Sequence, residues 1–157
     1  MSKTSISDAI KTKMEAIDGI NNVFDYVFWT DDYQVIYNYL SANGRIDSWH
    51  IGQGATTTTI DSGMKIRNYL WNIFGIYSIK TSDESSKAFE LLIEKILDDF
   101  SISFSFLAQT NHTPPNLVIL ENGVYSNTPV HRCQIQLPVT ERTAQNLQNP
   151  QGGDCGG

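Results

Sequence analysis

The sequence predicts an α+β protein, in which two amphipathic helices pack on a mixed, mainly antiparallel β-sheet. Residues 5–17 and 81–100 repeat apolar side chains every three or four positions, the period of a helix with one buried face. Other segments alternate apolar with polar residues, or concentrate β-branched and aromatic residues, as strands do. With 157 residues we expect one domain over 1–142 and a flexible tail over 143–157, where glutamine, asparagine and glycine dominate.

The first helix is expected over residues 5–17, with Ile6, Ile10 and Met14 on its buried stripe and Gly19 as its stop. The second follows a capping box from Thr81 to Glu84, in which a hydroxyl accepts from a backbone N–H and the glutamate reaches back. Its predicted buried stripe consists of Phe89, Leu92, Ile93, Ile96, Leu97 and Phe100. Its outer face is acidic, with Glu90, Glu94 and Asp98 set against few lysines.

In the first half of the chain, residues 23–29 are expected to form a strand. Residues 33–40 alternate so that Tyr33, Tyr37 and Tyr39 line one side of a second strand, and Asn43-Gly44 suits a hairpin turn into residues 45–51. Residues 52–63 are rich in glycine and threonine and predict a surface loop, or alternatively the tip of a long hairpin.

In the second half, residues 64–79 have two mostly apolar faces, which predicts a strand inside the sheet. Residues 101–106 are either a strand or the end of the helix, and the prolines at 114 and 115 force a break. Residues 117–120 predict a short strand that ends in an Asn122-Gly123 turn. Residues 130–139 alternate with Cys133 facing inward, and Pro138 indicates an edge or a strand end.

The acidic balance, a net charge of -6 and a pI near 4.9, argues against tight binding of nucleic acid, which depends on basic side chains. No apolar run approaches the roughly 20 residues of a membrane helix. The N-terminal residues lack the apolar core of a secretory signal, so we expect the protein to stay in the cytosol. Cys133 and Cys155 are expected to be free thiols.

No common catalytic motif occurs in the sequence: it has no phosphate-binding glycine loop, paired-cysteine zinc pattern, or nucleophile elbow. Asp31 and Asp32 are either a carboxylate pair for acid–base or cation chemistry or a solvated turn, and we favour the turn. Cys133 beside His131 suggests a nucleophile and a base, but a buried cysteine on a strand is more often a core residue. We therefore expect no enzyme activity, metal or cofactor.

The aromatic residues are either base-stacking platforms, core residues or interface residues. Stacking platforms usually lie in basic grooves, and the arginines here are isolated, so we favour core for Trp71 and an interface for part of the tyrosine row. The candidate interface comprises Trp29, Asp31, Asp32, Tyr33, Tyr37, Tyr39, Gln53, Thr57 and Thr58.

The order of these elements resembles that of the tail terminator, or tail-completion, proteins of long-tailed bacteriophages. The resemblance rests on the first helix and the residues that follow it (6–24), the strand and helix over residues 67–100, and the closing strand over residues 131–137. It contains no diagnostic short motif.

The resemblance implies a non-enzymatic virion protein of the tail or neck, assembled in the host cytoplasm. It implies a homo-oligomeric ring, generally of six copies, that caps the tail tube protein, ends tube growth and meets the head-side connector or stopper. DNA then passes through without specific binding, past Glu90, Glu94 and Asp98 on the lumen side. Two alternatives stay open, another neck component such as a head-closure or connector protein, and a small ligand-binding or enzymatic α+β domain.

Overall fold

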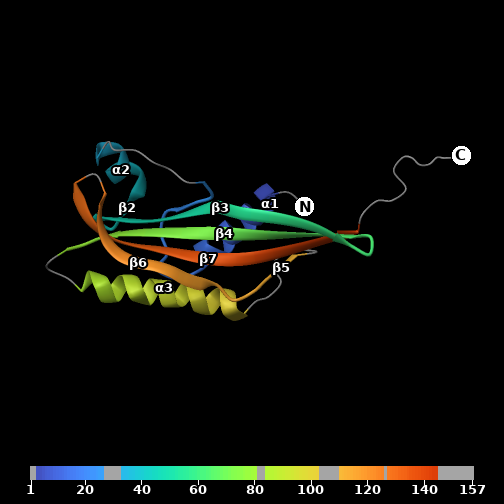
Figure 1. Ribbon diagram of the computed structural model, residues 1–157. Coiled ribbons are helices and arrows are strands. Elements are labelled where there is room, and N and C mark those ends of the chain that lie inside the picture. The colour runs from blue at the N-terminus through green and yellow to red at the C-terminus, as the bar shows by residue number, and fades with distance from the viewer. Residues whose placement is uncertain (1–2, 27–32, 81–83, 103–109, 126, 145–157) are drawn as a thin grey trace, which may run out of the picture.

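The computed structural model describes residues 3–26, 33–80, 84–102, 110–125 and 127–144 (Figure 1). These residues form an α+β fold, as the sequence predicts. The helices are α1 (Lys3–Glu15), α2 (Tyr33–Leu40) and α3 (Ser85–Ile102). The strands are β1 (Val23–Phe24), β2 (Ser41–Ala42), β3 (Arg45–Asp61), β4 (Met64–Ser78), β5 (Thr110–His112), β6 (Asn116–Tyr125) and β7 (Thr128–Ala144).

The sheet is built around three long strands. Its order is β1-β3-β4-β7-β5, with β2 also paired to β3 and β6 also paired to β7. Only the short β1–β3 pairing is parallel, and every other described pairing is antiparallel. Because β4 pairs with β3 and β7 along its whole length, the predicted interior strand is confirmed.

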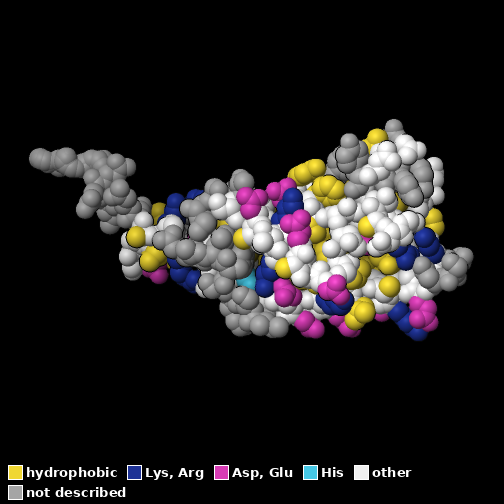
Figure 2. Space-filling model, turned by 180° about the vertical axis from the view of Figure 1, so that it is seen from behind, with side chains coloured by type: hydrophobic (Ala, Val, Ile, Leu, Met, Phe, Trp, Pro, Cys, Tyr) yellow, Lys and Arg dark blue, Asp and Glu magenta, His cyan; other side chains and the backbone are white. Residues whose placement is uncertain are grey.

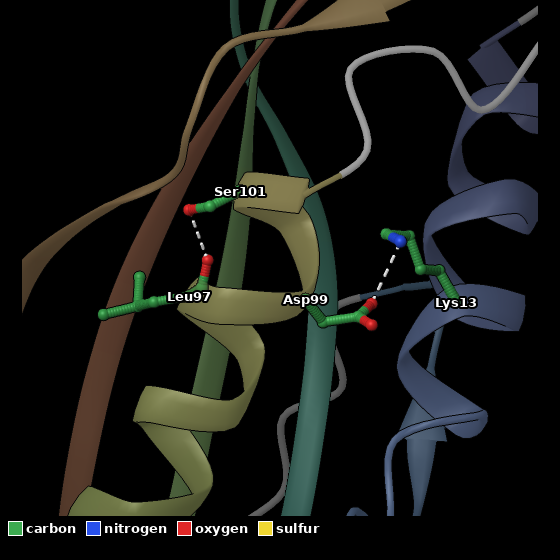
Figure 3. Close-up of polar contacts among 4 residues, drawn as sticks. All are labelled: Lys13, Leu97, Asp99 and Ser101. Carbon is green, nitrogen blue, oxygen red and sulfur yellow. Dashed lines mark hydrogen bonds and ion pairs between the residues drawn. The ribbon is translucent and has the colours of Figure 1, made fainter.

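The main core lies between one face of the sheet and the helices α1 and α3. Helix α1 contributes Ile6, Ile10 and Met14, and the predicted stripe of α3 is confirmed, with Phe89, Ile96 and Phe100 almost fully buried. The strands contribute alternate residues, namely Trp49, Ile51, Trp71, Ile73, Cys133, Ile135, Leu137 and Val139. Lys13 and Asp99 join the two helices through an ion pair of 3.0 Å, and the Ser101 hydroxyl donates to the Leu97 carbonyl (Figure 3).

A second, smaller core lies at one end of the opposite face, near α2 (Figure 1). It consists of Leu40, Ile46, Tyr125 and Val130, with Phe24 and Ile76 packed against it.

The predicted strand over residues 33–40 is wrong, because this segment is helix α2. Eight residues are too few to separate a period of 2 from one of 3.6, and here the helical positions bury Leu40 and let Gln34 donate to Asn38 one turn later. The alternation that grouped Tyr33, Tyr37 and Tyr39 on one side applies to a strand, so this reason for a tyrosine row is lost. The Asn43-Gly44 hairpin is confirmed with positive φ at both residues, but its first arm is only β2.

The strand predicted over residues 23–29 ends at Phe24 as β1, and residues 27–29 lie outside the described part. The surface loop predicted over residues 52–63 is wrong, and the alternative of a long hairpin is confirmed. Strand β3 continues to Asp61 and turns through Ser62 and Gly63, which both have positive φ, into β4.

Two predictions in the second half also need correction, and one open alternative is decided in part. Helix α3 begins at Ser85, and the Glu84 carbonyl accepts from the Ala88 N–H, so Glu84 lies at the helix start instead of one turn inside it. Residues 101 and 102 continue α3, which confirms the helix-end alternative for them, and residues 103–106 lie outside the described part. Strand β6 runs straight through Asn122 and Gly123, which form no turn; Asn127, with a φ of 62°, lies at the turn into β7.

Pro138 lies inside β7, so the predicted strand end is wrong. Its carbonyl accepts from the Thr113 N–H in the gap between β6, which pairs up to Gln136, and β5, which begins to pair at Val139. In an antiparallel strand the N–H and C=O of one residue point the same way, so the missing N–H of Pro138 falls in this gap and costs little ladder bonding.

Candidate functional site

The structure distributes the predicted interface residues over two distant places. Helix α2 carries Tyr33, Tyr37 and Tyr39 at one end of the molecule, and β3 carries Thr57 and Thr58 toward the other end (Figure 1). Gln53 lies between them on β3, and its amide donates to the Thr56 hydroxyl. Trp29, Asp31 and Asp32 lie outside the described residues. The described members of the predicted set therefore do not form one patch.

The hairpin between β3 and β4 forms an arm that extends past the helices (Figure 1). We call residues 56–68 the hairpin arm; residues 140–144 of β7 pair with its β4 strand. A register shift between Gln53 and Thr56 separates the arm from the body of the sheet. At its tip, Ile60 is 61% exposed and Met64 is 37% exposed. All residues of the arm are exposed or only partly buried.

The charge differs between the arm and the body. The arm and the end of β7 carry three basic residues, Lys65, Arg67 and Arg142, and two acidic ones, Asp61 and Glu141, and Arg67 donates to the Thr58 hydroxyl across the hairpin. Figure 2 shows Lys and Arg side chains close to the arm, with an Asp or Glu side chain beside them, and side chains of both charge signs over the middle of the molecule. On α3, Glu90, Glu94 and Asp98 are all exposed, as the sequence predicts for its outer face.

Strand β6 presents the most apolar exposed surface of the described sheet. Leu117, Val118, Ile119 and Leu120 are 39–48% exposed, and Val124 is 70% exposed. Among the described strands β6 pairs only with β7, so its other edge has no ladder partner there. We call this outer edge, over residues 116–124, the β6 edge. Sequence reasoning missed it because it took the segment for a short strand and a turn.

The opposite side of the sheet has a second unpaired edge. Strands β1 and β2 cover only residues 45, 46, 49 and 50 of β3. From Ile51 to Asp61, no described strand pairs with the outer side of β3, which we call the β3 edge. Among the described strands the sheet is therefore open on both sides, and each open side presents backbone N–H and C=O groups.

The buried polar cluster with the most defined geometry joins α3, β6 and β7. The His131 ring lies between two polar side chains: its Nδ1 is hydrogen-bonded to the Asn122 side-chain oxygen at 2.7 Å, and its Nε2 is hydrogen-bonded to the Ser85 hydroxyl at 2.9 Å. A hollow of about 270 Å³ lies beside it, lined by Ser86, Phe89, Glu90, Leu120, Glu121, Asn122 and His131.

The Ser85–His131–Asn122 order matches that of nucleophilic sites, but the surroundings favour packing over chemistry. Ser85 is only 4% exposed, and the carboxylates of Glu90 and Glu121 beside the hollow oppose the negative charge that acyl transfer develops. Phe89 stacks on the His131 ring with centroids 6.0 Å apart. The cluster therefore fastens the start of α3 to the sheet.

Cys133 is a core residue, as the sequence favoured. Burial raises the pKa of its thiol to about 12, so the reactive thiolate is negligible at neutral pH. The remaining histidines are buried too, and burial lowers the pKa of both His50 and His112.

Within the described residues, no group of three or more His, Cys, Asp or Glu side chains is placed to hold a metal ion. None of the described helices combines the length and the apolar character needed to cross a membrane. No protein-family model matches the chain, and no curated protein sequence matches it.

Proposed function

We propose that this chain is a structural virion protein of the tail-terminator type, which forms a ring on the tail tube, ends tube growth and joins the tail to the head connector. The supporting observation is that one open sheet carries two different unpaired edges on opposite sides, the β6 edge and the β3 edge. Two different surfaces on one chain are what head-to-tail association requires, and such association closes into a ring when the rotation between copies permits.

The charge distribution is compatible with DNA passage. Glu90, Glu94 and Asp98 are exposed on one side of α3, and we propose that they face the lumen of the ring. Carboxylates there repel the DNA phosphates. Because binding to DNA depends on basic side chains that displace counterions from the phosphates, we expect DNA to pass without being bound.

A second candidate is another neck component, such as a head-closure or connector protein. The three longest strands, β3, β4 and β7, favour it, because the chain is richer in long strands than the sequence predicts. The two candidates differ in partner: a tail terminator binds the end of the tail tube, whereas a head-closure protein binds the portal side.

Light scattering and negative-stain imaging of the full chain, alone and mixed with tail tubes, test the proposal. We expect a ring on one end of each tube and tubes of uniform length. A chain that stays monomeric in both conditions, or a ring that binds only the portal side, contradicts the tail-terminator function. We also expect no DNA gel shift at physiological salt with micromolar protein.

A further inference from the structure

The β6 edge has the properties of a strand that accepts a partner. Its apolar residues Leu117 to Leu120 are each 39–48% exposed, and Val118 is extruded at a register shift with no partner in β7. Soluble proteins usually protect a long apolar edge with charges, prolines or a covering segment. The single charge on this edge, Glu121, is already bound to Arg132 at 2.8 Å.

The β3 edge has the complementary properties of a donor. From Gly52 to Ile60 it has no charged residue, and its threonines favour the extended conformation. It spans eleven residues, from Ile51 to Asp61, against ten in β6. A strand of ten residues is about 33 Å long, so the two edges match in length.

The strand directions allow the two edges to pair. The order β3-β4-β7-β6 is antiparallel at each step, so β3 and β6 run in opposite directions on opposite sides of one sheet. When β6 of one copy lies beside β3 of the next, the new ladder is also antiparallel and the sheet continues without a change of pattern.

A symmetric pairing of β6 with β6 of another copy is less suitable. It brings two Glu121 carboxylates close to one another near the middle of the junction, and it leaves both β3 edges uncovered. It also ends at a dimer, whereas pairing of two different edges continues from copy to copy. A junction made by one pair of strands is smaller than standard interfaces, which bury about 1,200–2,000 Å². Because each copy in a closed ring makes two such junctions, the ring is favoured over an isolated pair.

We propose that the β6 edge of one copy binds the β3 edge of a second copy of this chain, which joins their sheets into one antiparallel sheet around the ring. This inference rests on the proposed function and specifies the surface that builds the ring.

Lysine substitutions on each edge test the pairing. Val118→Lys places a charge on the β6 edge at a position without a partner in β7, and Thr57→Lys places a charge on the exposed β3 edge, opposite Asn68 of β4. Leu91→Lys is the matched control, because Leu91 is 53% exposed on α3 and lies on neither edge. Sedimentation velocity and binding to tail tubes are expected to show association weakened at least about tenfold by each edge variant. The control is expected to associate like the wild type, and all three are expected to fold normally by circular dichroism.

Cross-linking separates the two modes of pairing. In a Cys155→Ser background, chains with Val118→Cys are mixed with differently tagged chains carrying Thr57→Cys and treated with a short bismaleimide; buried Cys133 does not react. We expect cross-links between the two kinds of chain and none within either kind. Cross-links within the Val118→Cys chains alone, or assembled rings with no cross-link, overturn this inference while the proposed function stands. A wild type that never assembles overturns both.

Discussion

Gly75 offers a sharp test of how the centre of the sheet is packed. A Cβ at this position would lie 2.8 Å from Cε3 of Trp49 and 2.9 Å from Sγ of Cys133, and closer still to Cζ3 of Trp49. Ordinary contacts of this kind are 3.4–4 Å, so the Trp49 ring must move by more than half an ångström. That ring is fully buried and stacked on Phe89, with centroids 5.6 Å apart. The ring therefore has no free space to enter.

Two effects of Gly75→Ala oppose one another. Overpacking lowers the free energy of unfolding by about 1–3 kcal/mol. Alanine also restricts the unfolded chain more than glycine does, which raises the free energy of unfolding by about 0.4–1 kcal/mol. We expect a net loss of about 1–2 kcal/mol in the free energy of unfolding, which corresponds to a fall of about 2–8 °C in the melting temperature for a chain of this size. Urea unfolding followed by tryptophan fluorescence measures it, as a lower midpoint with an unchanged slope.

A control and a coupled variant make the interpretation specific. Gly123→Ala is expected to stay within about 0.5 kcal/mol of the wild type, since its Cβ meets only the flexible Arg132 side chain, at 3.4 Å. Trp49→Phe removes part of the obstructing ring. The double variant is therefore expected to lose at least about 0.5 kcal/mol less free energy of unfolding than the two single variants lose in total. A Gly75→Ala protein as stable as the wild type refutes the reasoning.

Three further predictions concern polar groups. Burial raises the pKa of Asp47, against a hydrogen bond from Asn21, so the folded state binds its proton more tightly and the protein loses stability as pH rises through that raised pKa. Asp47→Asn is expected to remove this loss and leave stability at pH 7 unchanged or higher by up to about 1 kcal/mol, measured by urea unfolding from pH 4 to 7. Asn122→Ala is expected to cost about 1–3 kcal/mol in thermal unfolding, because it leaves a buried imidazole nitrogen of His131 without its acceptor. Lys13→Ala is expected to cost less than about 1 kcal/mol, with a smaller cost at high salt, because its ion pair with Asp99 is partly exposed.

The long elements could be predicted from the sequence because their burial patterns repeat many times. Strand β4 lies inside the sheet, α3 buries Phe89, Ile93 and Ile96, and β7 points Cys133 and Ile135 inward, all as predicted. Each of these elements lies in the sheet or packs on it, so one of its sides is buried along most of its length. The spacing of apolar residues in the sequence is then enough to show which side is buried.

Short and exposed elements could not be predicted in the same way. Helix α2 has too few residues to show its period, and its type depends on the small core that Leu40 forms with Ile46 and with Val130, which is 90 positions further along the chain. The hairpin arm has no buried face along Thr56 to Thr59, so alternation is missing and only the ladder with β4 makes it a strand.

The candidate surfaces were harder to predict, because whether a strand has an open edge depends on which other strands pair with it and not on its own sequence. The β6 edge is open because, among the described strands, β6 has a ladder partner on one side only. The hydrogen bond between Ser85 and His131 likewise joins residues 46 positions apart in the sequence. The predicted interface residues contributed Thr57 and Thr58 on the arm, but nothing in their spacing marked the apolar strand that we propose they meet.

We propose that stability and assembly depend on different parts of this chain. The main core lies on the face covered by α1 and α3, while the β6 edge and the hairpin arm are exposed and add little to it. Substitutions such as Gly75→Ala should therefore weaken folding while leaving the edges in place, and edge substitutions such as Val118→Lys should weaken association while leaving folding unchanged. If edge substitutions lowered the stability of the fold as much as they weakened association, the edges would belong to the folded core. The proposed ring would then need another surface.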